Sequence, residues 1–575
     1  MSAFDKLALA MIPSGYKGGA DPNNAGGFLG RVYSVLPAQG QIDILNIQSV
    51  PSWANWDGSV ITTDGNGDTG YINIIQNNEA KANRTYQLTV TAQLNNTIVK
   101  IYATGNTFQN LQEGTNTYTF VHDGGGNNVI RFRVENDSGI TLSNISLTTA
   151  SNGDFNFSRG SDATRVNSQG YIESVQASGV DDTDIPRLDY TNQACPSLLL
   201  EPQRSNLNVY SEDFSQWTTS GSTSITDNVS GVTSPDGNNK ASLLDKNGQA
   251  YGRIEVINNV TTTGYYTFSV FAKKTDIDSW IKLRIDSATG AQETSFNLSN
   301  GEIGTSGVLP YDSGVQEFAN GWYRFYIVAN ITDASANEYF RIYVMDTEGG
   351  EGNANPATAY IWGAQAELGS YPTSYIPTNG STVTRLADVC NNAGDSTIFN
   401  DAEGVLYAEI NKPTLNPNDY WLISVNDNTA SNTVVIGWTN GGDELFARVI
   451  ANGVVPVSYI SGEFQKDTYY KIALKYKSGD SAVWVNGVEI HPDADTFTFS
   501  NSLKSINFDY GNGNNDFRGR VRSLLYFNEA LTNEELEKLT SSTATQVLNN
   551  YSTLLTRVGA TYESSGLETK LNELL

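Results

Sequence analysis

Hydrophobic and polar residues alternate with a period of two along much of this chain. In the runs 86–92 (YQLTVTA) and 130–134 (IRFRV), every second residue is apolar and the residues between are polar or charged. Successive side chains of a strand point to opposite faces, so these runs predict strands with one buried face. Turn-forming segments, such as DGNGDTG at 64–70 and DGGGNN at 123–128, separate the runs. This rhythm is typical of an antiparallel β-sandwich.

Runs of this kind fall into three blocks, at 40–149, 206–390 and 395–530. The second block contains YYTFSVFAKK and GWYRFYIVANIT, which are strands of a length that suits a jelly roll. The third contains YYKIALKYKSGDSAVWVNGVEI, where a Ser-Gly-Asp turn beginning at Ser478 joins two alternating strands into a hairpin. The predicted fold class is all-β: tandem antiparallel β-sandwiches, jelly-roll or concanavalin-like, with a short C-terminal helical segment.

The segments before and between these blocks carry different patterns. Residues 1–39 are rich in Gly and Pro and hold too few apolar positions for a core of their own, so we predict that they pack on something else. An attachment segment that folds against a partner and a disordered terminus are the two alternatives. Residues 150–205 show no sustained period, which predicts an extended connector lying against the neighbouring domains. The apolar anchors of the first segment are Leu7, Leu9, Met11, Ile12 and Tyr16.

The C-terminal segment, residues 531–575, has a helical pattern. Thr532 followed by Glu535 fits a capping box at the start of a short helix. Beyond it, apolar residues recur at spacings of three and four from Val547 to Leu574, which predicts two further short helices. These helices either associate with other copies or pack on the third sandwich.

Composition and charge exclude several classes of protein. The net charge is −27, which repels nucleic acid phosphates and anionic membrane surfaces, and no basic patch is visible in the sequence. The two cysteines, Cys195 and Cys390, are too few for a disulfide scaffold, so we expect buried thiols. There is no basic leader with a cleavage site and no apolar run of about 18 residues, so we expect synthesis in a cytoplasm and no membrane insertion.

Several phrases of the sequence resemble a recurrent module of bacteriophage tail and appendage proteins. They are SAFDKLALAMIPSGYK, FNFSRGSDATRVNSQGYIE, IPRLDY followed by CPSLLLEPQRSNL, and YSEDFSQW. The resemblance covers residues 1–35 and 150–390. Residues 40–149 resemble a carbohydrate-binding-module jelly roll that is inserted into the shorter family pattern, and residues 395–530 resemble the laminin-G or concanavalin-like fold.

The resemblance implies a fibre-like virion protein of the tail or head, made in the host cytoplasm and exposed on the particle surface. Residues 1–39 would attach it to other virion proteins, the sandwiches would bind host-surface glycans, and by analogy with phage fibres the protein would form a homotrimer. A purely structural, decoration or adaptor protein without a ligand is the second hypothesis, from a different class. A glycan depolymerase is the third.

Exposed aromatic rings are the feature to search for in a sugar site, because sugar rings stack on aromatic faces while polar side chains bind the hydroxyls. Trp53 and Trp56 lie in the polar segment VPSWANWDG, and Trp438 precedes a Gly-rich turn in GWTNGGD. These three, with the weaker candidate Tyr420, are the predicted carbohydrate-binding residues. The tryptophans that fall within strand patterns are assigned to the cores: Trp280, Trp322, Trp362 and Trp484.

Metal binding and catalysis have little support. Asp64, Asn66 and Asp68 alternate in a way that could chelate Ca²⁺, but the twelve-residue loop with its closing Glu is absent, so a turn is preferred and no cofactor is predicted. With only His122 and His491, no histidine-based triad can be formed, and neither GxSxG nor HExxH occurs. We therefore predict no catalytic residues and no enzymatic activity.

Overall fold

The computed structural model describes residues 6–13, 31–32, 47, 50–75, 85–103, 107–121, 130–149, 153–175, 185–193, 195–288, 290–305, 307–334, 337–414, 420–440 and 443–541. Antiparallel strands make up most of this part, and its one α-helix is α1 (Asn533–Thr540). The predicted fold class, tandem antiparallel sandwiches with a short C-terminal helix, is confirmed. In the same ranges, no helix is long and apolar enough to cross a membrane.

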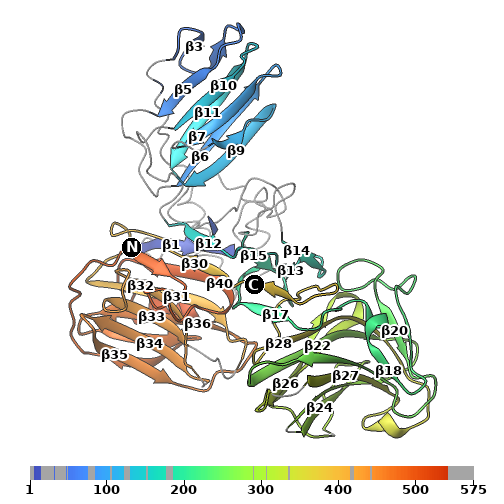
Figure 1. The fold of residues 1–575 in the computed structure, drawn as a ribbon. Helices are drawn as coiled ribbons and strands as arrows, with labels where there is room; N and C mark the ends of the chain where they lie inside the picture. Colours follow the sequence, from blue (N-terminus) through green and yellow to red (C-terminus); the bar gives the residue numbers. More distant parts are fainter. Residues whose placement is uncertain are drawn as a thin grey trace.

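Figure 1 shows the first sandwich standing apart from a body in which the second and third sandwiches lie side by side. The first sandwich packs the sheet β5-β10-β7-β8 against the sheet β3-β4-β11-β6-β9. Ile72, Leu88, Phe132 and Leu142 are fully buried between them. The strands are β3 (Ala54–Trp56), β4 (Ile61–Thr63), β5 (Gly70–Ile75), β6 (Thr85–Gln93), β7 (Ile98–Ala103), β8 (Thr107–Asn110), β9 (Gly114–Val121), β10 (Ile130–Glu135) and β11 (Thr141–Thr149).

The first sandwich is inserted into a small sheet of the body. β2 (Arg31–Val32) pairs with β12 (Phe155–Ser158), and β12 also pairs with β30 (Val389–Asn391). Val32 lies opposite Phe155 in antiparallel register. The chain therefore leaves the body and returns to it on adjacent strands, with the whole first sandwich between them.

The second sandwich packs the sheet β18-β21-β27-β23-β24 against the sheet β19-β20-β28-β22-β26-β25. Phe268, Leu283, Phe325 and Phe340 are fully buried in its core. β17 (Arg204–Asn206) and β29 (Val383–Arg385) pair beside it. The other strands are β18 (Thr218–Ser220), β19 (Ser224–Thr226), β20 (Ser242–Asp245), β21 (Arg253–Asn259), β22 (Gly264–Lys274), β23 (Trp280–Ser287), β24 (Gly290–Asn297), β25 (Asp312–Phe318), β26 (Trp322–Ile331), β27 (Asn337–Met345) and β28 (Thr358–Leu368).

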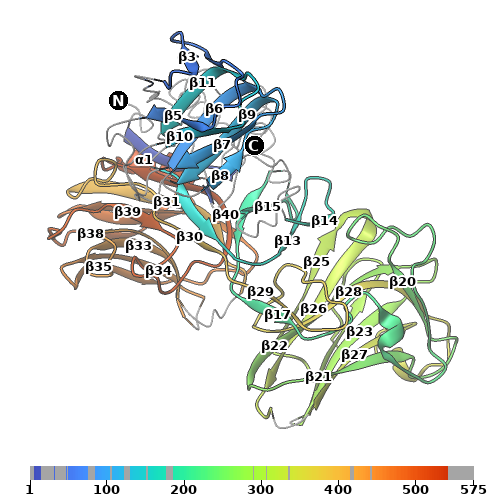
Figure 2. The ribbon, with the colours of Figure 1, turned by 45° about the horizontal axis from the view of Figure 1, so that its top comes forward.

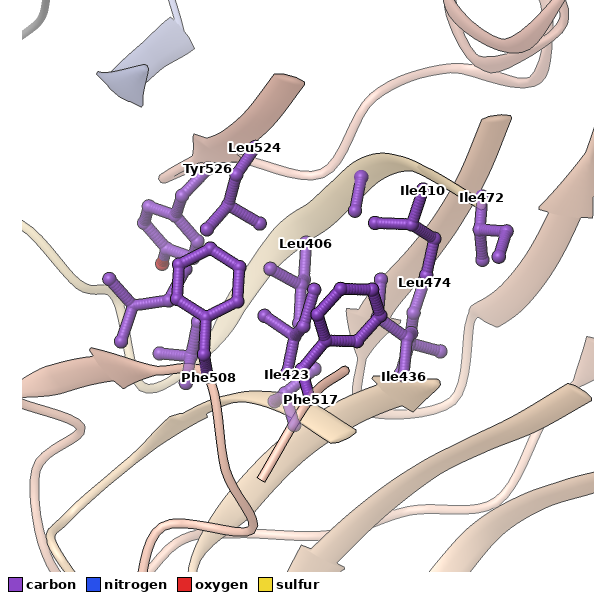
Figure 3. Packing of buried hydrophobic residues seen from close by; sticks show 14 of the residues in the cluster. Leu406, Ile410, Ile423, Ile436, Ile472, Leu474, Phe508, Phe517, Leu524 and Tyr526 are labelled. Atoms are coloured by element: carbon purple, nitrogen blue, oxygen red, sulfur yellow. The ribbon is translucent and has the colours of Figure 1, made fainter. Parts of the chain in front are cut away.

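The third sandwich packs the sheet β15-β16-β40-β31-β36-β37-β38 against the sheet β35-β34-β33-β32-β39. Figure 3 shows its core, where Leu406, Ile423, Ile436 and Leu474 meet between the sheets. The strands are β15 (Arg187–Asp189), β16 (Ser197–Leu200), β31 (Glu403–Asn411), β32 (Trp421–Asn426), β33 (Thr433–Trp438), β34 (Leu445–Ala451), β35 (Val454–Ser461), β36 (Tyr469–Lys477), β37 (Ser481–Val485), β38 (Val488–Asp493), β39 (Ser505–Asn507) and β40 (Gly519–Phe527).

The beginning of the chain belongs to the third sandwich. β1 (Leu7–Met11) pairs with the C-terminal half of β40, next to the half that pairs with β16. Leu7, Leu9, Met11 and Ile12 are at most 4% exposed. The prediction that these anchors pack on something else is confirmed, because the sandwich built by the end of the chain buries them. Tyr16 lies outside the described residues, and attachment by residues 1–39 stays a prediction.

The C-terminal helix packs on the same sandwich. α1 has the predicted capping box, in which the Thr532 side chain accepts from the Glu535 backbone and the Glu535 carboxylate accepts from the Thr532 backbone. Leu536 is fully buried, and Glu535 also pairs with Lys6 at 3.1 Å. The helical pattern predicted from Val547 onward lies outside the described residues.

Buried ion pairs tie the connector to the segment between the second and third sandwiches. β13 (Thr164–Val166) and β14 (Ile172–Ser174) form a hairpin, and β15 and β16 extend the large sheet of the third sandwich. The Arg187 guanidinium pairs with Asp388 and, at 2.7 Å, with Glu201. Burial alone would raise the pKa of Glu201, but Arg385 and Arg187 hold it well below its usual range. Both cysteines are buried as thiols, as predicted.

Candidate functional site

Trp438, a predicted sugar-binding residue, is fully buried in the third sandwich. Its indole N–H donates to the Asn411 carbonyl at 3.1 Å, and its ring lies 5.5 Å from that of Phe464. The prediction that it is exposed is wrong, because β33 is the central strand of its sheet and Trp438 points into the core. Of the tryptophans assigned to cores, Trp322, Trp362 and Trp484 are buried and Trp280 is half-buried.

The other predicted residues keep some exposure. Trp53 and Trp56 are half-buried at the margin of the first core. Trp53 covers the start of β5, where a Cβ on Gly70 would lie 2.8 Å from the Trp53 ring. Tyr420 is half-buried with its ring 5.3 Å from that of Phe446. These residues lie in two different sandwiches, so they do not form one site, and their glycan role stays a prediction.

The segment at residues 64–68, which was considered for Ca²⁺, forms a turn. Asp137, from a distant part of the chain, holds this turn in place. The Asp137 carboxylate accepts from the Thr63 hydroxyl at 2.5 Å and from the Gly65 backbone at 2.8 Å. The Asp64 carboxylate accepts from the backbone N–H of Asn66. In the parts of the chain that the structure describes, no three His, Cys, Asp or Glu side chains converge as a metal site requires.

A different group of residues gathers on the outer face of the sheet β5-β10-β7-β8. The alternation in β10 sends Phe132 and its neighbours into the core and sends Arg131 and Arg133 outward. The pairing register then places Tyr71 and Lys100 on either side of Arg133, and Asn73 and Tyr102 on either side of Arg131. We call this surface the open face; its residues are Tyr71, Asn73, Lys100, Tyr102, Arg131, Arg133 and Glu135.

Charged and aromatic groups contact one another across the open face. Glu135 accepts ion pairs from Lys100 and from Arg133, both at 3.0 Å. Arg133 also donates to the Tyr102 hydroxyl at 3.1 Å, and this hydrogen bond raises the pKa of Arg133. The rings of Tyr71 and Tyr102 meet edge to face with centroids 5.7 Å apart.

Two groups on the open face have unused binding capacity toward the described residues. The Arg131 guanidinium lies 3.9 Å from the centroid of the Tyr71 ring, and no carboxylate among the described residues pairs with it. The Oδ1 atom of Asn73 is buried and has no hydrogen-bond partner in that part of the chain. Because an unpaired buried acceptor costs free energy, a hydroxyl donor bound there would be favoured.

The sequence carries only part of the signal for this site. The run IRFRV at 130–134 places both arginines on the outward side of one strand. The aromatic and amide partners come from β5 and β7, whose pairing with β10 is not encoded by any local pattern. The search for tryptophan in loops also passed over tyrosine within strands.

The outer face of the corresponding sheet in the second sandwich is different, because its charges are paired with one another. Arg341 pairs with Asp286 and, at 2.7 Å, with Glu255. Lys282 lies 3.3 Å from Glu293 and is only 3% exposed. Such a face offers fewer free donors than the open face.

A pocket lies where the connector and the second and third sandwiches meet, and three arginines line it. Arg165 pairs with Glu173 at 2.6 Å and Arg520 with Asp189 at 3.0 Å. The buried Arg324 donates to a backbone carbonyl. These arginines already have partners, so the open face is the better candidate.

Comparisons with known proteins found solved structures that are similar to parts of this chain. No family model and no curated protein matches the chain. The CBM40 of the Ruminococcus gnavus IT-sialidase, solved with α2,3 sialyllactose, is 15% identical over 25% of this chain and 86% of its own, with a TM-score of 0.21. Domain 4 of the Geobacillus stearothermophilus GH43 arabinanase AbnA, solved with arabinotriose, is 14% identical over 30% of this chain and 84% of its own, with a TM-score of 0.22. With TM-scores this low, the matches assign no ligand to this protein.

Proposed function

We propose that this protein binds carbohydrate through the open face of its first sandwich, and that it does so without cleaving the sugar. The observation that carries the proposal is the set of groups gathered there: the cation Arg131, the unpaired Asn73 acceptor and the 40% exposed Tyr71 ring. Sugars present hydroxyls and apolar ring faces, and side chains of these types bind both. The absence of a histidine-based triad from the sequence supports the non-enzymatic part of the proposal.

We further propose that the protein is a fibre-like virion appendage. The support is the sequence resemblance of residues 1–35 and 150–390 to phage tail and appendage proteins. A sheet face buries little of a sugar, so single-site affinity will be low, but several copies on one particle would raise avidity by about 10²–10⁴. Attachment to virion proteins and homotrimer formation belong to the same proposal.

A glycan array probed with the full chain tests the binding function. The double variant Tyr71→Ala/Asn73→Ala should lose retention on every glycan that the parent protein retains, since both groups face the ligand. Tyr339→Ala is the matched control, because Tyr339 lies on the outer face of the second sandwich with Arg341 4.8 Å from its ring centroid. Equal retention by the double variant would contradict the site, and release of reducing sugar ends would contradict the non-enzymatic claim.

One observation favours a purely structural role for the body, which consists of the second and third sandwiches. Arg159 lies 3.3 Å from Asp388 and Arg385 lies 3.4 Å from Glu201, and all four side chains are almost fully buried. Breaking a buried ion pair is strongly destabilising, so this cluster resists motion of the connector. The second and third sandwiches would then act as a spacer that carries the first.

A further inference from the structure

We propose that the open face selects acidic glycans, in which a carboxylate or sulfate of the sugar binds Arg131. The inference rests on the proposed function and names its ligand class. Arg131 supports it first, because its guanidinium lies 3.9 Å from the Tyr71 ring centroid and pairs with no carboxylate among the described residues. Stacking on an aromatic ring orients the planar guanidinium, whose donors match an oxyanion in a bidentate arrangement.

The same contact argues against recognition by ring stacking alone. The guanidinium covers one face of Tyr71, and Tyr102 is only 6% exposed. A neutral sugar would have to displace Arg131 to stack on that face of Tyr71. An acidic sugar would instead use the guanidinium where it lies.

The local charge of the open face differs from that of the whole chain. Lys100, Arg131 and Arg133 carry three positive charges, and Glu135, which both Lys100 and Arg133 contact, carries one negative charge. The difference, three minus one, leaves a surplus of two positive charges on a protein whose net charge is −27. Salt screens distant charges over about 8 Å at physiological ionic strength, so an anionic group on this face experiences mainly the local surplus.

A second contact would distinguish a sugar from a simple anion. Asn73 lies opposite Arg131 in the strand pairing, and its Oδ1 atom lacks a donor. An acidic sugar bound with its anionic group on Arg131 can donate a neighbouring hydroxyl to Asn73 once the Asn73 side chain turns outward from its buried position. The Arg131 guanidinium and the neighbouring Asn73 acceptor therefore fit a ligand that carries both an anionic group and a hydroxyl.

Nucleic acid is the other polyanion that a face with arginine and tyrosine could bind. Binding of single strands relies on free aromatic faces for the bases and on a basic groove along the backbone. The open face supplies neither, because Arg131 covers Tyr71 and the surplus is confined to a few residues of an acidic protein. The observations therefore favour the acidic glycan.

The test is an array that carries neutral, carboxylated and sulfated oligosaccharides together with a single-stranded DNA homopolymer, probed with the full chain. The strongest carboxylated ligand is then titrated by calorimetry beside its carboxyl-reduced form. We expect acidic glycans to be retained, carboxyl reduction to weaken binding about tenfold or more, and added salt to weaken it further. The carboxylated and sulfated arms decide which anion is preferred.

Variants of Arg131 complete the test. Arg131→Gln should lose about tenfold in affinity for the acidic ligand, and Arg131→Lys, which keeps the charge without the planar fork, should lose less. Arg448→Gln should change nothing; Arg448 lies 4.6 Å from the Phe446 ring centroid in the third sandwich and is the matched control.

Each result decides between the two proposals. Retention of neutral glycans alone, lost in Tyr71→Ala/Asn73→Ala, would overturn the acidic class while leaving the proposed function intact. Unchanged affinity of a folded Arg131→Gln would also overturn it, and DNA bound more tightly than any glycan would replace it with nucleic acid recognition. No retention on any glycan would overturn both proposals.

Discussion

At the residue scale, burial separates two tryptophans whose sequence surroundings are alike. Trp56 and Trp438 each precede a polar, turn-forming segment. Trp438 nevertheless belongs to the central strand of its sheet and is fully buried, whereas Trp56 belongs to the edge strand β3 and is half-buried. Exposure of an aromatic residue near a turn therefore depends on the position of its strand in the sheet.

This difference predicts unequal effects of truncation. Trp438→Ala should lower the free energy of unfolding of the third sandwich by about 3–5 kcal/mol, because a large buried ring leaves a cavity. Trp56→Ala should cost less, since part of that ring is already in water. Urea unfolding followed by hydrogen exchange in β33 and β3 would measure both. A Trp438→Ala protein of parental stability that no longer retained glycans would return this residue to the binding site.

At the scale of elements, the strand β1 shows that the first residues complete a sandwich formed by the last. Leu9 and Met11 are fully buried in the third core, and the strand borders β40. Without β1, this half of the β40 edge would expose backbone groups and apolar side chains to water. Exposed strand edges of this kind pair with other chains.

Deletion of residues 2–12 should therefore destabilise the third sandwich and promote aggregation. Leu9→Ala should cost about 2–5 kcal/mol for the same reason, while Ala8→Ser, at a half-buried position of the strand, should cost much less. Thermal unfolding and light scattering would measure these effects. A deletion variant as stable as the parent, yet unable to join particles, would support the view of this segment as an anchor alone.

At the scale of the whole molecule, the first sandwich is a module added to a complete body. Figures 1 and 2 both show it above the third sandwich and apart from the second. Because β2 and β12 are adjacent, the ends of the insertion lie close together. Insertions whose ends are close are tolerated by the fold that receives them.

Replacing residues 34–153 by a short Gly/Ser linker should therefore leave the second and third sandwiches folded. Their circular dichroism and melting temperature should change little, while retention on the glycan array should disappear. If the variant still bound glycans, the site would lie in the second or third sandwich. If these two sandwiches failed to fold, the body would depend on the insertion.

Local patterns in the sequence were enough to predict the class of fold and the helical capping box. Period-two alternation, turn residues and the pair Thr532 and Glu535 are local properties, and they act on the backbone wherever the segment lies. The run IRFRV likewise determined which side of β10 is polar. These features could be predicted because the forces that produce them act between residues close in sequence.

The meeting of distant segments could be read only from the folded chain. The tertiary structure paired β1 with β40 from the opposite end of the chain, buried Trp438 in a central strand, and placed Tyr71 and Asn73 beside Arg131. Strand pairing depends on backbone hydrogen bonds that are the same for every residue. Local sequence therefore does not specify which strand will pair with which. The partner is selected by the packing of whole sheets, and the candidate site exists only after that packing is complete.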